Sequence, residues 1–327
     1  MKILVAGCGS IGKRHLKNAG QVAEAAVFDT DPQVLFECER EHGIQTFGDL
    51  KTALEWKPDG VVIATPTNLH IPIALDCIEV GADVLIEKPI SHSNDGVESF
   101  LKLAESLKRK IFVACNMRFH PAINTIRKNL HFIGKPLFAR AHYGNYLPEM
   151  RPNVNYRKLY AASRLQGGGV ILDGIHELDY LVWLFGAIQE VLCRADKLSD
   201  LEIDTEDYAG ILLRHQTGVA SEIHLDYLRP FKLRGCEIVG DQGILLWRSE
   251  GKNPEKCSVR LYKRHTAKWE RLFYSEGLDI NKPYEILMQH FIGGIQGRDV
   301  PILTGREAAE ELAVALKALE FFSSTKR

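Results

Sequence analysis

The stretch Gly7-Cys8-Gly9-Ser10-Ile11-Gly12 has the glycine spacing GxGxxG. It follows an apolar run at 2–6 and opens a segment of helical periodicity, the context in which this spacing binds a dinucleotide pyrophosphate. Gly7 would make the tight turn, Gly9 would let the backbone approach the phosphates, and Gly12 would let the helix pack on the strand. The alternative is that these glycines only punctuate a strand-to-helix turn.

An acid follows the second predicted strand, 24–28. Asp29 lies about 20 residues beyond the glycines, where a carboxylate binds the adenosine ribose. Asp31 adds a second negative charge, and the stretch 29–33 contains no Arg or Lys to attract a 2′-phosphate. The sequence therefore predicts NAD as the cofactor and disfavours NADP. The alternative for Asp29 is a turn or helix-cap carboxylate.

Two further polar segments each follow an apolar run, at 64–70 and at 87–89. Both lie where the carboxyl ends of parallel strands bind ligands. The residues that we expect to contact the cofactor there are Thr65, Pro66, Asn68, His70, Glu87 and Lys88. Lys88 also has a structural alternative, a surface ammonium paired with Glu87.

Asp173 and His176 are three residues apart in a segment, about 169–185, that reads as one helix, so they share a face. A neutral His can take the hydroxyl proton of an alcohol while hydride leaves its carbon, and a nearby carboxylate can orient the ring. The alternative is a structural acceptor beside a satisfied interior His. No HExxH motif or His/Cys/acid cluster at ligand spacing occurs, so no metal is predicted.

The elements that must position these residues fall into two patterns. Short apolar runs alternate with helical segments over the first 118 residues, which predicts a doubly wound parallel sheet with strands at 2–6, 24–28, 60–64, 83–86 and 110–114. Residues 119–327 predict an α/β domain with a largely antiparallel open sheet. Its strand-like runs are 136–146, 188–197, 206–214, 218–227, 232–240, 243–249, 257–264 and 268–274. An irregular polar stretch spans 147–166, and Thr304 with Glu307 forms a capping box before the last helix.

Composition limits the partners. The 327 residues carry 41 basic and 42 acidic side chains, so no excess of positive charge favours nucleic acid or a membrane surface. No apolar run approaches the roughly 20 residues of a membrane-spanning helix. Seven cysteines without a CxxC pair predict reduced thiols in a reducing compartment. We expect a cytoplasmic protein with a small-molecule partner.

Taken together, the motifs resemble the Gfo/Idh/MocA family of NAD(P)-dependent sugar and cyclitol oxidoreductases. The resemblance spans nearly the whole chain and rests on the N-terminal glycines, TPxxxH at 65–70, Glu87-Lys88-Pro89, the stretch 116–121, and Gly167-Gly168-Gly169 before Asp173 and His176. It implies an N-terminal Rossmann domain at 1–118 and a substrate-binding and oligomerisation domain at 119–327. It also implies a homodimer or homotetramer, with Lys88 beside the nicotinamide and the substrate.

The resemblance further implies hydride transfer between NAD and a secondary alcohol of a sugar, sugar acid, sugar nucleotide or cyclitol, with His176 and Lys88 at the reacting centre. The usual Asp-to-His spacing is four and here it is three, a departure that is similar to members linked to bacterial surface-sugar pathways and that bears mainly on Asp173. Substrate contacts are expected from Asn153, Asn155, Tyr156, Arg157, Arg164, His70, Arg118 and His120. The alternatives are glycoside cleavage or rearrangement through transient oxidation, and a non-catalytic dinucleotide-binding regulator.

Overall fold

The computed structural model describes residues 1–151, 154–251 and 255–324. They form two compact units. Unit 1 consists of Met1–Asn116 and Asn281–Leu312, and unit 2 of Met117–Ile280 and Ala313–Arg327. In the described part of the chain, no helix combines the length and the apolar character that crossing a membrane requires.

Unit 1 contains a six-stranded parallel sheet in the order β3-β2-β1-β4-β5-β6. Its strands are β1 (Lys2–Ala6), β2 (Glu24–Phe28), β3 (Gln45–Phe47), β4 (Gly60–Ile63), β5 (Asp83–Glu87) and β6 (Ile111–Ala114). Most are apolar runs buried on both sides, as expected for strands with helices on both faces. The predicted doubly wound sheet is confirmed, and the short strand β3 is an addition to it. The strand order reverses between β1 and β4, which places a ligand-binding edge at their carboxyl ends.

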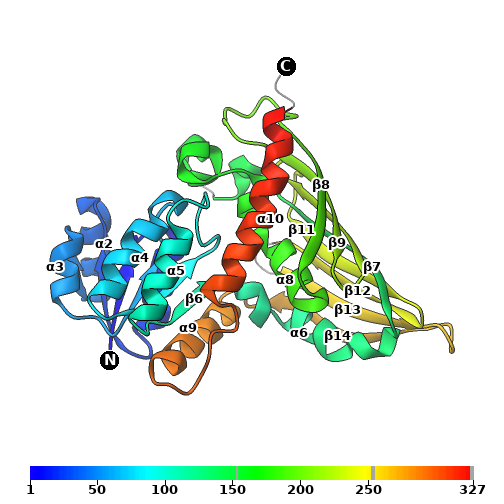
Figure 1. Cartoon of the computed structure of the whole chain (residues 1–327), viewed down its shortest axis with the longest axis horizontal. Coiled ribbons are helices and arrows are strands. Elements are labelled where there is room, and N and C mark those ends of the chain that lie inside the picture. Colours follow the sequence, from blue (N-terminus) through cyan, green and yellow to red (C-terminus); the bar gives the residue numbers. More distant parts are fainter. Residues whose placement is uncertain (152–153, 252–254, 325–327) are drawn as a thin grey trace. The chain divides into compact units, whose positions relative to one another are not determined.

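Helices cover this sheet, and α4 and α5 pack against one another (Figure 1). They are α1 (Ser10–Ala19), α2 (Pro32–His42), α3 (Leu50–Glu55), α4 (His70–Glu79), α5 (Val97–Ser106) and α9 (Lys282–Ile295). Local signals set their ends. Asp31 accepts a hydrogen bond from the Gln33 N–H at the start of α2, and Gly43 ends that helix at φ +61°.

Residues 281–312 group with unit 1, so the observed division differs from one cut near residue 118. The reason is packing, because α9 lies against the parallel sheet. A Cβ on Gly60 would come within 2.6 Å of Ile295 Cδ1 and 2.9 Å of Phe291 Cζ, and the Phe291 ring stacks edge-on against Phe112. Helix α10 (Gly305–Ser324) starts in unit 1 and continues into unit 2.

The capping box at the start of α10 is confirmed. The Thr304 N–H donates to Glu307 Oε2 at 2.8 Å, and the Glu307 N–H donates to Thr304 Oγ1 at 3.2 Å. These two bonds satisfy backbone donors that have no partner within the helix.

Unit 2 is built on an eight-stranded sheet in the order β14-β13-β12-β11-β7-β10-β9-β8, in which only the β10–β7 pair is parallel. The strands are β7 (Pro136–Gly144), β8 (Ile188–Asp196), β9 (Tyr208–His215), β10 (Ala220–Asp226), β11 (Leu233–Gly240), β12 (Gly243–Glu250), β13 (Glu255–Lys263) and β14 (Lys268–Leu278). Helices α6 (Pro121–Asn129), α7 (Val170–Asp173) and α8 (Ile175–Phe185) pack on it (Figure 1). The largely antiparallel sheet is confirmed.

Two details of unit 2 bear on the site. The polar stretch 147–166 forms four short 3₁₀ turns, at 147–149, 156–158, 160–162 and 164–166. The single helix predicted at 169–185 is wrong, because it breaks at Gly174 into α7 and α8. A Cβ on Gly174 would lie 2.8 Å from both Leu225 Cδ2 and Val170 O, so this close packing on β10 needs a glycine. Asp173 therefore ends one helix, and His176 lies in the first turn of the next.

Candidate active site

The turn between β1 and α1 leaves almost no room for side chains at two of its glycines. A Cβ on Gly7, whose φ is +88°, would lie 2.8 Å from the Thr65 backbone nitrogen, and a Cβ on Gly12 would lie 2.0 Å from Gly7 O. At Gly9 the opposite holds, because no described atom lies within 4 Å of the position of its Cβ. Gly9 also precedes α1 without a side-chain cap, so the first N–H groups of the helix can receive an anion.

Asp29 is bonded to the same turn. Its Oδ2 accepts the Cys8 N–H at 2.7 Å, and its Oδ1 accepts the Asp31 N–H at 3.0 Å. A carboxylate has about four lone-pair positions, so two backbone bonds still leave acceptors for ribose hydroxyls. The turn role and the ligand role of Asp29 are thus compatible.

Several polar atoms at this end of unit 1 fit a polar ligand. Among the described residues, Thr65 Oγ1, Asn68 Oδ1 and Asn116 Oδ1 are buried and have no hydrogen-bond partner. Buried polar atoms are rarely left unpaired in a native protein, so an orphaned set at the carboxyl ends of strands indicates groups that a ligand satisfies. The donors, the acceptors and the open side of Gly9 together fit a dinucleotide.

The loops after β4 and β5 are tied together by His70. Its ring is buried, with Nδ1 at 2.9 Å from Pro89 O and Nε2 at 3.1 Å from Thr65 O. Burial lowers the pKa of His70, although both carbonyls favour the protonated ring. The His70 ring therefore bonds two loops of the protein, both of which were predicted to contact the cofactor. In the second of these loops, the peptide bond between Lys88 and Pro89 is cis.

In unit 2, Asp173 is held by two tyrosines. The Tyr160 hydroxyl donates to Asp173 Oδ1 at 2.5 Å and the Tyr227 hydroxyl donates to Oδ2 at 3.3 Å. Burial raises the pKa of Tyr227, so its hydroxyl stays a donor. His176, three residues on, is buried. These tyrosines were not predicted. Tyr227 directly follows β10 and continues the buried alternation of Ile223 and Leu225, but nothing local in the sequence points to Asp173 as its partner.

The glycine run before Asp173 has a packing reason. A Cβ on Gly168 would lie 2.2 Å from Tyr160 O, and one on Gly169, at φ +106°, would lie 2.4 Å from Glu206 Oε1. Glu206 accepts the Ile171 N–H at 3.0 Å in the first turn of α7. Burial raises the pKa of Glu206 to about 7. A fully buried carboxyl group thus supports the turn that carries Asp173.

Arg118 and His120, predicted to extend the substrate pocket, are both buried in unit 2. Arg118 Nε donates to the buried Asp179 Oδ1 at 2.8 Å. The His120 ring lies against Trp247, and its Nε2 is 3.5 Å from Glu255 Oε1. Burial raises the pKa of Glu255, but contacts with His120, Lys232 and Ser249 outweigh it and hold that pKa at about 2.

One group of potential metal ligands lies here, since His120, Glu255 and Cys257 have their ligand atoms within 4.8 Å of one another. The Lys232 ammonium is 3.0 Å from Glu255 Oε2, and the Trp247 indole N–H donates to Cys257 Sγ. These donors already bond Glu255 and Cys257, and His120 Nδ1 accepts the Ala122 N–H, so we interpret the group as an internal ion-pair and hydrogen-bond network.

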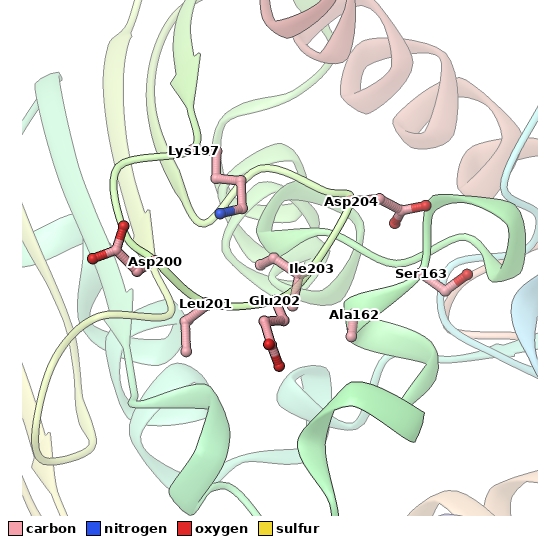
Figure 2. A pocket seen from close by; sticks show the side chains of 8 residues that line it. All are labelled: Ala162, Ser163, Lys197, Asp200, Leu201, Glu202, Ile203 and Asp204. Atoms are coloured by element: carbon pink, nitrogen blue, oxygen red, sulfur yellow. The ribbon is translucent and has the colours of Figure 1, made fainter.

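The irregular segment packs on residues 197–204, and side chains from both segments line a pocket of about 580 Å³ (Figure 2). Its lining is Ala162, Ser163, Lys197, Asp200, Leu201, Glu202, Ile203 and Asp204. Three of the predicted substrate residues contact this segment. Arg157 pairs with Glu202, the Glu202 N–H donates to the Tyr156 hydroxyl at 3.3 Å, and the Arg164 N–H donates to Asp204 Oδ1 at 2.7 Å. Asn155 caps the turn at 156–158, and Asn153 lies outside the described residues.

Comparisons with known proteins agree with this architecture. A family described as oxidoreductases with an NAD-binding Rossmann fold matches residues 1–115, and the C-terminal domain of the Gfo/Idh/MocA family matches residues 129–246. A 1,5-anhydro-D-fructose reductase from Ensifer adhaerens is 25% identical over 80% of this chain and 77% of its own. An inositol 2-dehydrogenase from Corynebacterium glutamicum is 26% identical over 75% and 72%.

Among solved structures, the WlbA dehydrogenase from Bordetella pertussis, in complex with NADH and UDP-GlcNAcA, has a TM-score of 0.81 at 21% identity. The match covers 100% of this chain and 97% of that one. It shows the same fold. With both family domains matched in order along the sequence, the chain belongs to the Gfo/Idh/MocA family of oxidoreductases and carries its NAD-binding Rossmann domain at the N-terminus.

Proposed function

We propose that the chain catalyses reversible hydride transfer between NAD and a secondary alcohol of a sugar, sugar acid, sugar nucleotide or cyclitol. The observation that carries the proposal is the set of polar groups at the carboxyl ends of the strands of unit 1. Helix α1 begins there without a side-chain cap, buried oxygens of Thr65, Asn68 and Asn116 have no hydrogen-bond partner among the described residues, and Lys88 directly follows β5. When bound, the nicotinamide supplies the two-electron acceptor or donor. Loss of hydride and a proton from the carbinol leaves a carbonyl.

The chain's own residues move the proton and hold the substrate. His176 accepts the hydroxyl proton, and the Lys88 ammonium donates a hydrogen bond to the reacting oxygen. Both must reach the same alcohol for the reaction to occur. Asp173, held in place by Tyr160 and Tyr227, orients the His176 ring and binds the substrate. The buried Arg118 and His120 support this surface from within, and Tyr156 and Arg164 of the irregular segment contribute to specificity.

We propose NAD rather than NADP because Asp29 places a carboxylate where a 2′-phosphate would have to lie. Parallel fluorescence titrations with NADH and NADPH test this. We expect NADH to bind at least about tenfold more tightly. Tighter binding of NADPH would contradict the charge argument at Asp29, and no binding of either nucleotide would contradict the oxidoreductase proposal itself.

A substrate panel tests the reaction class. The first compounds are those in the names of similar proteins: inositol, 1,5-anhydro-D-fructose and UDP-N-acetylglucosamine. We expect one hydride transferred to or from the nicotinamide for each substrate converted. Turnover without net change in NADH would favour glycoside cleavage or rearrangement instead. A Lys88→Ala variant whose activity in this assay equals that of the wild type would favour the other alternative, a non-catalytic dinucleotide-binding regulator.

For assembly, we propose a homodimer or homotetramer that pairs through the outer face of the eight-stranded sheet. On that face Leu192 lies opposite Leu212, and Phe138 and Trp269 lie in a second row that crosses β11, β12 and β13. Each of these four side chains is at least 39% exposed. Exposed apolar patches of this kind mark interaction surfaces. Light scattering of the wild type and of a Leu212→Glu variant tests this. We expect an oligomeric wild type and a monomeric variant, and a monomeric mass for both proteins would contradict the proposal.

We also propose a cytoplasmic location. None of the seven cysteines, all within the described residues, forms a disulfide, although Cys8 Sγ and Cys38 Sγ lie 3.1 Å apart. Two thiols this close would pair readily in an oxidising compartment. Cell fractionation with a tagged chain tests the location, and secretion would contradict it.

A further inference from the structure

Two histidines that the proposed chemistry does not use hold the residues on either side of Lys88. His15, in α1, lies with Nε2 at 2.7 Å from Glu87 Oε1, and His70 lies with Nδ1 at 2.9 Å from Pro89 O. Both rings are at most 1% exposed. His15 attracts attention because it links the helix behind the glycine turn to the residue that precedes Lys88.

The chemistry of the His15–Glu87 contact fixes its direction. An ionised carboxylate can only accept, so the His15 Nε2–H donates. His15 Nδ1 is buried and has no hydrogen-bond partner among the described residues, so the bond to Glu87 is the one that orients the ring. The second oxygen of Glu87 accepts the backbone N–H of Lys88 at 3.2 Å. A continuous path thus runs from α1 through two side chains to the Lys88 backbone.

The His15 ring has little freedom to move. It packs edge-on against Tyr284 of α9, with centroids 5.7 Å apart. One turn along α1, Asn18 Oδ1 accepts a hydrogen bond from the Asn281 side chain at 3.1 Å. These contacts join α1 to α9 within unit 1, so the donor at Nε2 is presented to Glu87 from a rigid pair of helices.

Stability alone is a weak reason for this pair. Burying a polar pair costs desolvation that an apolar side chain of similar volume does not, and the orphaned Nδ1 adds to that cost. Positions where a fold accepts such a cost are expected at functional sites. We propose that His15 is a positioning residue that, through Glu87, sets the place of the Lys88 ammonium at the reacting alcohol. This inference rests on the proposed function.

The test compares His15→Leu with His15→Gln, because the Gln amide can return a donor near the position of Nε2. His42→Leu, at the exposed C-terminal end of α2, is the matched control. The first readout needs no substrate: competitive labelling with acetic anhydride, quantified by peptide mass spectrometry, reports the reactivity of Lys88. The exposed Lys51 is the internal reference.

We expect His15→Leu to change Lys88 labelling relative to Lys51 by about fivefold and to lower kcat on the active panel compound by about tenfold, with NADH affinity within about threefold of wild type. In His15→Gln, Lys88 labelling and kcat should both be close to their wild-type values. His42→Leu should match the wild type in both measurements. Unchanged labelling in His15→Leu, or equal losses in the Leu and Gln variants, would overturn the inference.

If His15→Leu does not fold, Glu87→Ala removes the same bond from its other side. We expect the same change in Lys88 labelling, and a wild-type labelling pattern in Glu87→Ala would overturn the inference. Where both single variants fold, the double variant should be no worse than either one, because one path is cut twice. Labelling that responds to His15 while the wild type neither binds NADH nor turns over the panel would instead contradict the proposed function.

Discussion

Asp29 and His70 in unit 1 are held by backbone groups, whereas Asp173 and Arg118 in unit 2 are held by other side chains. Asp29 accepts two backbone N–H groups at the glycine turn, and His70 faces two backbone carbonyls in the loops after β4 and β5. In unit 2, Asp173 is bonded to two tyrosine hydroxyls, and Arg118 donates to the buried Asp179 carboxylate.

This difference separates two kinds of constraint. A backbone-held site requires the chain to follow one path, so it depends on glycines and tolerates few side chains. A side-chain-held site can change partners while the sheet beneath it stays the same. We therefore expect substitutions in unit 1 to act on cofactor binding and folding together, and those in unit 2 to act on turnover with the cofactor still bound.

The largest effect should come from Gly12→Ala. Its Cβ would lie 2.0 Å from Gly7 O, a backbone atom, so α1 or the turn must move. We expect NADH affinity to fall by more than about 100-fold and the thermal midpoint to fall as well. Fluorescence titration and thermal unfolding measure the two.

Gly9→Ala is the matched control for that variant. Its Cβ meets nothing within 4 Å, so the thermal midpoint should not change. NADH affinity should nevertheless fall by about tenfold, since the methyl group occupies the space assigned to the pyrophosphate. Wild-type affinity in Gly9→Ala would show that the phosphates bind elsewhere.

His176→Ala should separate turnover from binding in unit 2. Loss of the proton acceptor is expected to lower kcat by about 10³-fold, within the usual range for a general base, while the NADH affinity stays at the wild-type value. Steady-state kinetics on the active panel compound measure this. His265→Ala, an exposed histidine, controls for loss of an imidazole. A kcat within threefold of wild type would remove His176 from the reaction.

Glu206 makes the folding stability of unit 2 depend on pH. Its pKa in the folded chain is about 7, above the ordinary 4.5, so the folded state keeps a proton that the unfolded chain has lost between those values. The free energy of unfolding therefore includes the full contribution of this proton below about pH 4.5. The contribution decreases as pH rises from about 4.5 to about 7, and the total loss is about 3 kcal/mol.

The Glu206→Gln variant tests this sign. The amide oxygen can still accept the Ile171 N–H, but the side chain never ionises. The thermal midpoint of the variant minus that of the wild type should increase as pH rises from about 5 to about 8. Parallel curves across that range would mean that Glu206 titrates normally in the folded chain.

The parallel half of the fold was predictable because its signals are local. Apolar runs marked five of its six strands, and β3 escaped because Gln45-Thr46-Phe47 is too short to show a period. The glycine spacing likewise predicted the tight contacts of Gly7 and Gly12. His15 could have been found, since it lies one helical turn after Gly12 on the buried face of α1.

The arrangement in unit 2 was less accessible. The strands were visible from alternation, but the partners of Asp173 come from positions 13 and 54 residues away. The break at Gly174 depends on the approach of Leu225 from another strand. Contacts of this range leave no trace in the local spacing, so the helix through 169–185 was predicted as continuous.

Tyr160→Phe tests the side-chain network more finely. The substitution removes the hydroxyl that donates to Asp173 Oδ1 at 2.5 Å. We expect kcat/KM to fall by about tenfold, the cost of one hydrogen bond to a charged group, with NADH affinity unchanged. Tyr274→Phe is the matched control, since its hydroxyl also donates to a carboxylate, that of Glu276, on the exposed strand β14. Equal effects in both variants would argue against a special role for Tyr160.

Arg157→Ala should have the smallest effect. The guanidinium pairs with Glu202, and both side chains are at least half exposed. Exposed pairs of this kind contribute about 0–1 kcal/mol, so the thermal midpoint should change little and KM should stay within about threefold of wild type. Steady-state kinetics decide between this and the direct substrate contact that the sequence predicted for Arg157. A tenfold rise in KM would mean that the guanidinium leaves Glu202 to bind substrate, and it would place a side chain of the irregular segment in the reacting site.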